Sequence, residues 1–236
     1  MSIPELSIVI PFYNEQDNAK TVLTGLENAL KGVDYEVIAV DNGSTDNTAS
    51  VLRGMKNSRI RIVTVEKNIG FGYGIRMGLE SAKGVHLGYM WGDNQISAGI
   101  VADIYRKLSK EGLDLCKIRR TARDYGFFRK LESAAYNRVF LALFFGKISN
   151  DINGSPKIMK RALYERLELV SDDWFIDTEL MVKVKLLGGR VGEVKAAYNR
   201  RSKGKSKVKF YVMLEFLSNI LRFRFGGLKK FKDSVD

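Results

Sequence analysis

Residues 35–46 read YEVIAVDNGSTD, a short apolar run followed at once by polar and turn-forming residues. Such a run predicts a buried strand, and the turn residues predict a loop at its carboxyl end. The same order occurs three more times within residues 1–100, with helical spacing of apolar residues in between. This alternation predicts a mostly parallel sheet with helices on both faces, an α/β fold. Strands are expected at 6–11, 35–40, 60–65 and 86–91, and helices at 18–30, 48–55 and 73–82.

The composition is that of an ordinary globular protein, with 45% hydrophobic and 28% charged residues in a chain of 236. The single cysteine, Cys116, excludes an internal disulfide, and the single histidine, His86, excludes a histidine-rich metal site. No apolar run approaches the roughly 18 residues of a membrane-spanning helix. The first ten residues lack the basic start of a signal peptide, so we expect none.

Polar and glycine-rich loops follow all four expected strands. In open α/β sheets, ligands bind beyond the carboxyl ends of the strands, so these loops predict a binding edge. Each loop by itself is equally consistent with ordinary turn chemistry, but four in series favour a functional site. The segments are PFYNE (11–15), DNGSTD (41–46), NIGFGYG (68–74) and GDNQ (92–95).

Asp93 and Gln95 are two residues apart, just beyond the fourth strand. Hard oxygen ligands in this position suit Mg²⁺ or Mn²⁺, and such an ion would hold a diphosphate and stabilise it as a leaving group. The alternative is a turn aspartate that caps the next helix. The absence of a Walker lysine pattern, and of GxGxxG after the first strand, argues against a P-loop enzyme and a dinucleotide-binding fold.

Taken together, PFYNE, DNGSTD, NIGFGYGIRMGL (68–79) and WGDNQ (91–95) resemble the motifs of family 2 glycosyltransferases, which have the GT-A fold, and especially of the polyprenyl-phosphate glycosyltransferases. The resemblance covers about residues 5–210 and implies a hexosyltransferase. This enzyme would be metal-dependent and inverting, and would move a sugar from a GDP- or UDP-sugar to a polyprenyl or dolichyl phosphate. Further matches are RKLES (129–133), DING (151–154), DTEL (177–180) and the segment from Arg201 to Lys207.

The resemblance also implies roles for individual residues. Asp93 and Gln95 would bind Mg²⁺ or Mn²⁺, and Arg129 with Ser133 would hold the acceptor phosphate. Asp177 occupies the place where hydroxyl-using relatives carry a catalytic base. The nucleotide-sugar would be bound by Pro11, Tyr13, Glu15, Val40, Asp41, Asn42, Trp91, Gly92, Asp93, Arg120 (or its neighbour Arg119), Arg201 and Lys207.

Two residues depart from the family pattern. Trp91 stands at the first aspartate of the DxD motif, and the loss of that carboxylate weakens metal affinity. Asn42 stands at the second aspartate of DDGS, and an asparagine can donate as well as accept a hydrogen bond, which bears on base preference. These departures leave open a catalytically degenerate GT-A-like binding module.

The acceptor is also left open between two classes. A lipid phosphate is already anionic and needs a cationic cradle, which Arg120 and Arg129 would provide. A hydroxyl of a glycan or lipid-linked saccharide would instead need a carboxylate base within hydrogen-bond reach. Asp177 could be that base, or it could be the N-cap of the helix expected at 178–187, or both.

The carboxyl-terminal part of the chain is strongly basic. Residues 195–236 hold 12 Lys and Arg against 3 Asp and Glu, within a chain of formal net charge +12. Residues 200–209, RRSKGKSKVK, suit a flexible loop that orders around phosphates. We therefore expect a GT-A domain at 1–199 and an appendage at 200–236.

Residues 208–225 place apolar side chains at helical spacing, which predicts an amphipathic helix. With its cationic flank, this helix would lie in the membrane interface, or it would pack on the domain or in a homodimer. A similar pattern occupies residues 133–146. We expect peripheral attachment to the cytoplasmic face of the membrane. Nucleic-acid binding is not expected, because the aromatic residues follow a helical spacing rather than that of a stacking surface.

Overall fold

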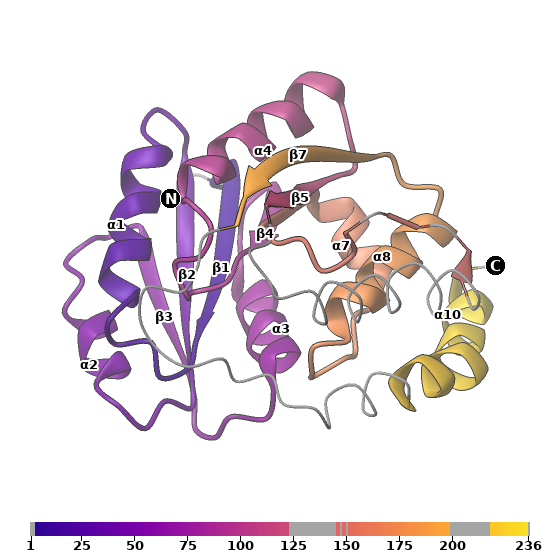
Figure 1. Ribbon diagram of the computed structural model, residues 1–236, viewed down its shortest axis with the longest axis horizontal. Helices are drawn as coiled ribbons and strands as arrows, with labels where there is room; N and C mark the ends of the chain where they lie inside the picture. Colours follow the sequence, from indigo (N-terminus) through magenta and orange to yellow (C-terminus); the bar gives the residue numbers. More distant parts are fainter. Residues whose placement is uncertain (1–2, 123–144, 147, 150, 199–217, 236) are drawn as a thin grey trace.

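The computed structural model describes residues 3–122, 145–146, 148–149, 151–198 and 218–235. Its first part alternates strands and helices as the sequence predicts (Figure 1). These elements are β1 (Leu6–Phe12), α1 (Ala19–Ala29), β2 (Tyr35–Asn42), α2 (Thr48–Arg53), β3 (Ile60–Val65), α3 (Phe71–Ser81) and β4 (His86–Tyr89). The later elements are α4 (Gly99–Glu111), β5 (Leu115–Ala122), β6 (Lys157–Lys160), α7 (Arg161–Leu167), α8 (Ile176–Leu186), β7 (Val191–Ala197), the π-helical turn η2 (Phe223–Gly227) and α10 (Leu228–Val235).

The strands form one seven-stranded sheet in the order β3-β2-β1-β4-β6-β5-β7. Strand β6 is antiparallel to both of its neighbours, and the other described strands run in one direction. In the register, Lys157 of β6 stands opposite Tyr89 of β4 and Lys117 of β5. The beginning of β6 therefore lies at the edge where β4 ends.

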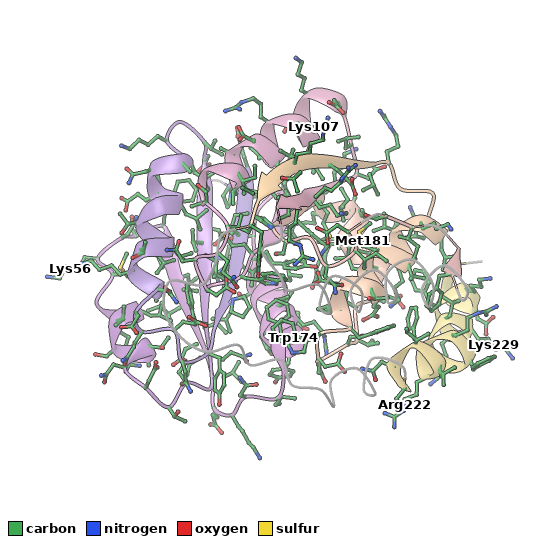
Figure 2. All side chains as sticks on the ribbon, viewed as in Figure 1. Lys56, Lys107, Trp174, Met181, Arg222 and Lys229 are labelled. Atoms are coloured by element: carbon green, nitrogen blue, oxygen red, sulfur yellow. The ribbon has the colours of Figure 1, made fainter. Side chains whose placement is uncertain are left out.

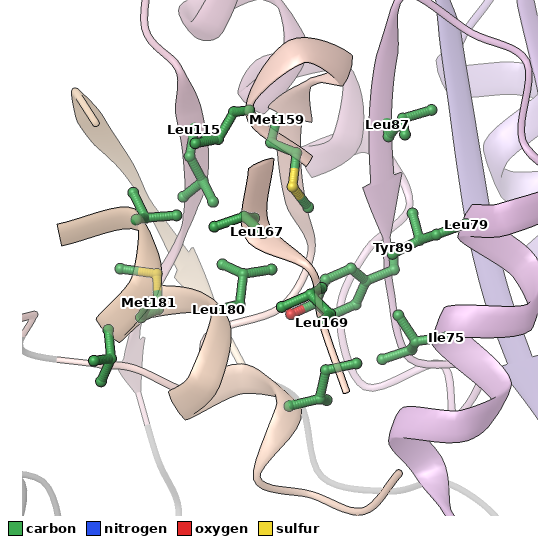
Figure 3. Packing of buried hydrophobic residues seen from close by; sticks show 14 of the residues in the cluster. Ile75, Leu79, Leu87, Tyr89, Leu115, Met159, Leu167, Leu169, Leu180 and Met181 are labelled. Atoms are coloured by element: carbon green, nitrogen blue, oxygen red, sulfur yellow. The ribbon is translucent and has the colours of Figure 1, made fainter. Parts of the chain in front are cut away.

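Helices cover both faces of the sheet, which confirms the prediction. One hydrophobic cluster packs α1, α2 and α4 on the sheet, and the other packs α3, α7 and α8 on the opposite face. Strand β1 shows the alternation directly, because Val9 belongs to one cluster and its neighbours Ile8 and Ile10 to the other. Figure 3 shows part of the second cluster, where α3 and α8 meet around Tyr89.

Helix α3 approaches β1 closely through a glycine. A Cβ on Gly78 would lie 2.2 Å from Cγ1 of Val9, so any side chain there would push the helix off the sheet. Because α3 follows β3 directly in the chain, its first turn, with Phe71, begins at the carboxyl edge of the strands.

The end of the described chain is helical from 218 and packs on the domain. Ile220, Phe223 and Leu228 are buried in the same cluster as α8, and α10 lies against α8 in Figure 1. Leu221 and Phe225 remain 40% and 73% exposed. Within the described residues, this helix thus packs by one face and leaves two apolar side chains on the other.

Three predicted segments lie largely outside the described residues: the basic stretch 200–209, the first ten residues of the helix at 208–225, and 133–144 of the helix at 133–146. Among the helices that the structure does describe, none combines the length and the hydrophobicity needed to cross a membrane.

Candidate active site

The loops after β1 and β2 are bound to each other at the carboxyl edge of the sheet. Asn14 has a left-handed φ of 52°, and its Oδ1 accepts the backbone N–H of Thr45 at 2.8 Å. The backbone N–H of Glu15 donates to Oγ1 of Thr48, also at 2.8 Å. These bonds join the PFYNE segment to the DNGSTD segment and to the start of α2.

The structure brings the predicted nucleotide-binding residues of these loops together. Pro11 and Val40 are register partners on β1 and β2, and Phe12 is the partner of Asp41. Glu15 and Asp41 are 8% and 4% exposed. Tyr13 is half-buried beside them in the chain. These predicted residues therefore lie together at the carboxyl edge of the sheet.

Asn42 fixes the first turn of α3. Its Nδ2 donates to the carbonyl oxygen of Gly70 at 2.9 Å, and a Cβ on Gly74 would lie 2.9 Å from its Cγ. An ionised carboxylate could not donate this bond, which gives a structural reason for asparagine here. The side chain is 2% exposed, and its Oδ1 has no hydrogen-bond partner among the described residues.

The loop after β4 presents Asp93 and Gln95. Asn94 between them has a φ of 57°, and Oδ1 of Asp93 accepts the backbone N–H of Gln95 at 3.2 Å. Oε1 of Gln95 accepts the hydroxyl of Tyr198 at 2.8 Å. Helix α4 begins later, with Ala98 as its N-cap, so Asp93 does not cap it and that alternative is wrong.

These donors fit a shared metal site. No group of three or more His, Cys, Asp or Glu that could hold a metal ion occurs in the described part of the chain. Asp93 and Gln95 offer one carboxylate and one amide oxygen. Mg²⁺ is commonly held by one or two carboxylates together with substrate phosphates and waters. The residues present therefore fit a divalent cation bound jointly with a diphosphate.

Arg120 at the end of β5 is held by Asp151. Its Nε and Nη2 donate to the two carboxylate oxygens at 2.9 and 2.6 Å, a bidentate pair. Its Cζ lies 5.4 Å from the ring of Trp91 and 5.4 Å from that of Tyr198. The neighbouring Arg119 is exposed. Asp151 belongs to the DING segment, which resembles the family, but the resemblance implied no role for it. The structure shows that Asp151 orients Arg120.

Asp177 is buried in an ion pair rather than placed at a helix cap. Helix α8 begins at Ile176 with Phe175 as its N-cap, so the predicted capping role of Asp177 is wrong. Oδ1 of Asp173 accepts the backbone N–H of Phe175 at 2.7 Å and so starts the turn earlier. Asp177 is 1% exposed, and its Oδ1 accepts bonds from Lys157 and, at 2.6 Å, from the hydroxyl of Tyr89.

Burial shifts the pKa values of Lys157 and Tyr89, the two side chains that donate to Asp177. It lowers the pKa of Lys157 to about 8, and the Asp177 carboxylate opposes that shift. Burial and the charge of Asp177 raise the pKa of Tyr89 well above its ordinary value. At neutral pH, Lys157 is therefore mostly charged and Tyr89 keeps its proton.

A second lysine, Lys117, is also fully buried. Its Nζ donates to the carbonyl oxygen of Asp151 at 2.7 Å and pairs with Glu193 at 3.0 Å. Neither Lys117 nor Lys157 belongs to any of the sequence motifs matched to the family. The remaining predicted residues, Arg129, Ser133, Arg201 and Lys207, lie outside the described residues.

The sheet, with antiparallel β6 and helices on both faces, is a GT-A fold. The chain matches glycosyl transferase family 2 over residues 7–167 and belongs to that family. The protein is therefore a glycosyltransferase, as the resemblance implied.

Two curated relatives cover nearly all of the chain. It is 25% identical over 98% of its length to the dolichol-phosphate mannosyltransferase of Pyrococcus furiosus. It is 28% identical over 94% of its length to the dodecaprenyl-phosphate galacturonate synthase of Rhizobium johnstonii. The chain spans 66% and 68% of the lengths of these relatives, or about two thirds.

Solved structures show the same fold. Glucosyl-3-phosphoglycerate synthase from Mycobacterium tuberculosis has a TM-score of 0.72 at 19% identity, covering 94% of this chain and 80% of that one. One crystal structure of that synthase contains Mn²⁺, UDP and glucosyl-3-phosphoglycerate. S. aureus TarS in complex with UDP-GlcNAc has a TM-score of 0.59 at 18% identity, over 92% of this chain and 66% of that one.

Proposed function

We propose that this glycosyltransferase transfers a sugar from a GDP- or UDP-sugar to a polyprenyl phosphate, with inversion and with Mg²⁺ or Mn²⁺. The names of both curated relatives include a polyprenyl phosphate, which supports the acceptor class. The observation that carries the proposal is the environment of the Asp177 side chain. Its carboxylate is buried and engaged by Lys157 and Tyr89, which favours an acceptor that needs no base.

On the donor side, Asp93 and Gln95 would hold the divalent cation together with the diphosphate. When bound, the cation supplies charge neutralisation to the leaving group. The nucleoside would lie on the surface of the first two loops, against Pro11, Tyr13, Glu15, Val40 and Asp41, with Asn42, Trp91 and Gly92 around it. Arg120, Arg201 and Lys207 would add positive charge near the phosphates.

On the acceptor side, the phosphate is the nucleophile. One of its oxygens forms a bond to the anomeric carbon while the bond from that carbon to the diphosphate breaks on the opposite face, which inverts the configuration. No proton has to be removed from the phosphate, so orientation and charge carry the step. Arg129 and Ser133 would hold the acceptor.

The exposed face of the carboxyl-terminal helix supports peripheral attachment at the cytoplasmic face of a membrane. Leu221 and Phe225 stand out beside the exposed cations Arg222, Arg224 and Lys229. Apolar side chains flanked by cations are the pattern of an interfacial helix. Such a location would bring the enzyme to the headgroup of its lipid substrate. Liposome flotation would distinguish this arrangement from a homodimer.

The proposal is tested by screening GDP- and UDP-sugars against polyprenyl phosphates with and without Mn²⁺. Asp93→Ala should lower turnover about 10³-fold, because the contribution of the cation is several kcal/mol. Asp103→Ala is the matched control, since Asp103 is an exposed carboxylate on α4. Equal turnover in the two variants, or full activity in EDTA, would contradict the proposal.

A hydroxyl acceptor is the second candidate, because the Asp177 carboxylate lies within hydrogen-bond distance of the last residue of β4 and so close to the carboxyl edge of the sheet. If Asp177 is a general base, Asp177→Asn should lower turnover of the folded enzyme by about 10²-fold or more. With a phosphate acceptor, the loss per folded molecule should stay below about tenfold. Turnover normalised to folded protein by circular dichroism separates the two acceptor classes.

A further inference from the structure

The two tryptophans of the chain both lie at the carboxyl edge of the sheet. Trp91 follows β4, and Trp174 precedes α8 beside the first turn of α3 (Figure 2). Both are half-buried, and neither belongs to either of the two hydrophobic clusters of the described residues. Packing of the core therefore does not account for these two large side chains.

Phe71 joins the two tryptophans into a row. Its ring is stacked on Trp174, with centroids 4.5 Å apart and an interplanar angle of 16°. It meets Trp91 edge-on at 6.5 Å. We call Trp174, Phe71 and Trp91 the aromatic row. Its three members come from three separate parts of the chain and converge at one place.

The backbone holds this row in place. The N–H of Tyr73 donates to the carbonyl oxygen of Asp172 at 2.9 Å, which ties α3 to the segment before Trp174. A Cβ on Gly72 would lie 2.4 Å from the carbonyl oxygen of Ser171, so the two segments are in direct contact. Such preorganisation lowers the entropy cost of binding a ligand on the row.

One polar atom in the row has no hydrogen-bond partner in the part of the chain that the structure describes. Nε1 of Trp91 is buried and has no hydrogen-bond partner among the described residues. The indole N–H is a donor only, so it would be satisfied by an oxygen atom of a ligand. Trp91 is two residues before Asp93, the proposed site of the diphosphate. The sugar of a nucleotide-sugar is bonded directly to that diphosphate.

We propose that the aromatic row is the surface on which the sugar ring of the donor stacks, with the indole N–H of Trp91 donating to a donor oxygen. This rests on the proposed use of a nucleotide-sugar. The C–H groups on one face of a pyranose are weakly positive and pack on the negative face of an aromatic ring. Trp91, which replaces a carboxylate of the family motif, is thereby a determinant of donor specificity.

The test compares nucleotides with and without the sugar. Binding of UDP and UDP-glucose, and of GDP and GDP-mannose, is measured by calorimetry with Mn²⁺. Trp174→Leu should weaken the sugar nucleotide about threefold to tenfold, while the affinity for the nucleoside diphosphate stays within about twofold. Trp174→Phe keeps an aromatic ring and should retain most of the affinity. Phe71→Leu provides a second, independent removal of an aromatic ring.

Tyr105→Leu is the matched control. Tyr105 is a half-buried aromatic residue packed on His86, which starts β4 at the opposite edge of the sheet. This variant should bind all four nucleotides like the unmodified protein. Tryptophan fluorescence adds a direct readout, because the sugar nucleotide should change the emission of the Trp91→Phe variant, whose remaining tryptophan is Trp174, more than the diphosphate alone does.

The outcomes separate this inference from the proposed function. If UDP or GDP binds but the sugar adds no affinity, or if Trp174→Leu and Phe71→Leu weaken both forms equally, the aromatic row does not bind the sugar. If neither nucleotide binds the unmodified protein, the proposed function itself fails, and the inference fails with it.

Discussion

Strand β1 buries seven residues without a charge among them, whereas β5 and β6 carry Lys117 and Lys157 fully into the interior. In the half of the sheet built from β1 to β4, the candidate site residues are at strand ends and in loops. In the half built from β5 to β7, ion pairs extend from the edge into the core. The first half is stabilised mainly by apolar burial, and the second also depends on matched charges.

The difference matters because substitutions of buried apolar side chains and of buried ion-pair partners have different costs in stability. Removing part of an apolar side chain costs in proportion to what is removed. Removing one partner of a buried ion pair leaves the other charge without compensation, and this costs more than the pair contributes when intact. The half with β5 to β7 is therefore more sensitive to single substitutions than its hydrophobicity indicates.

The largest expected effect is that of Lys157→Met, which leaves Asp177 buried and unpaired. The free energy of unfolding should fall by about 3–5 kcal/mol, measured by urea denaturation. Ile38→Val, in the other half, should cost only about 0.5–1.5 kcal/mol. The double variant Lys157→Met with Asp177→Asn removes both charges and keeps an acceptor for Tyr89, so it should recover much of the loss. Equal losses in the free energy of unfolding for Lys157→Met and Ile38→Val would contradict this difference between the two halves of the sheet.

A smaller effect is expected for Asn42, a buried polar residue at the end of β2 in the first half of the sheet. Asn42→Asp replaces the donor to Gly70 with a carboxylate, which should lower the free energy of unfolding by about 1–3 kcal/mol. Asn28→Asp is the matched control, because the exposed Asn28 donates a similar bond to the carbonyl of Thr24 at 3.1 Å. Thermal denaturation of both variants tests this, and equal stability would show that burial of Asn42 is unimportant.

The smallest effect is a dependence of stability on pH. The pKa of Lys157 is lowered from 10.5 to about 8 by burial, so between these values the unfolded chain binds a proton that the folded chain has lost. Stability should then rise with pH, by about 1 kcal/mol between pH 8 and 9, relative to the double variant. Below about pH 8, Lys157 is protonated in both the folded and the unfolded state. The stability of the unmodified protein and that of the double variant should therefore change with pH in parallel there. Parallel curves up to pH 10 would mean that Lys157 is not perturbed.

The same comparison explains what the sequence could predict. The strands β1 to β4 are apolar runs between turn residues, and the expected strand at 60–65 coincides with β3. The loops that follow them were predicted as the binding edge, because in a parallel sheet all those loops lie on one side. For the strands and helices of this half, periodicity and topology rules were sufficient, and the binding role of the loops stays a prediction.

The sequence of the half with β5 to β7 contains no comparable pattern. Strand β6 reads KIMK, and its buried Lys157 looks like a surface residue when its partner is unknown. That partner, Asp177, comes from a helix 20 residues further along the chain, and no local pattern links the two. The start of α8 was misplaced for a similar reason, since the Asx turn at Asp173 begins the helix early enough to place Asp177 inside it.

The reversed direction of β6 has one more consequence. The chain leaves β5 and enters β6 at the same edge of the sheet, because the two strands are antiparallel. The segment that connects them therefore begins and ends at the edge of the proposed active site, and Asp151 within it accepts the backbone N–H of Arg120 on β5. The length of that connection can therefore differ between relatives without a shift in the register of any strand.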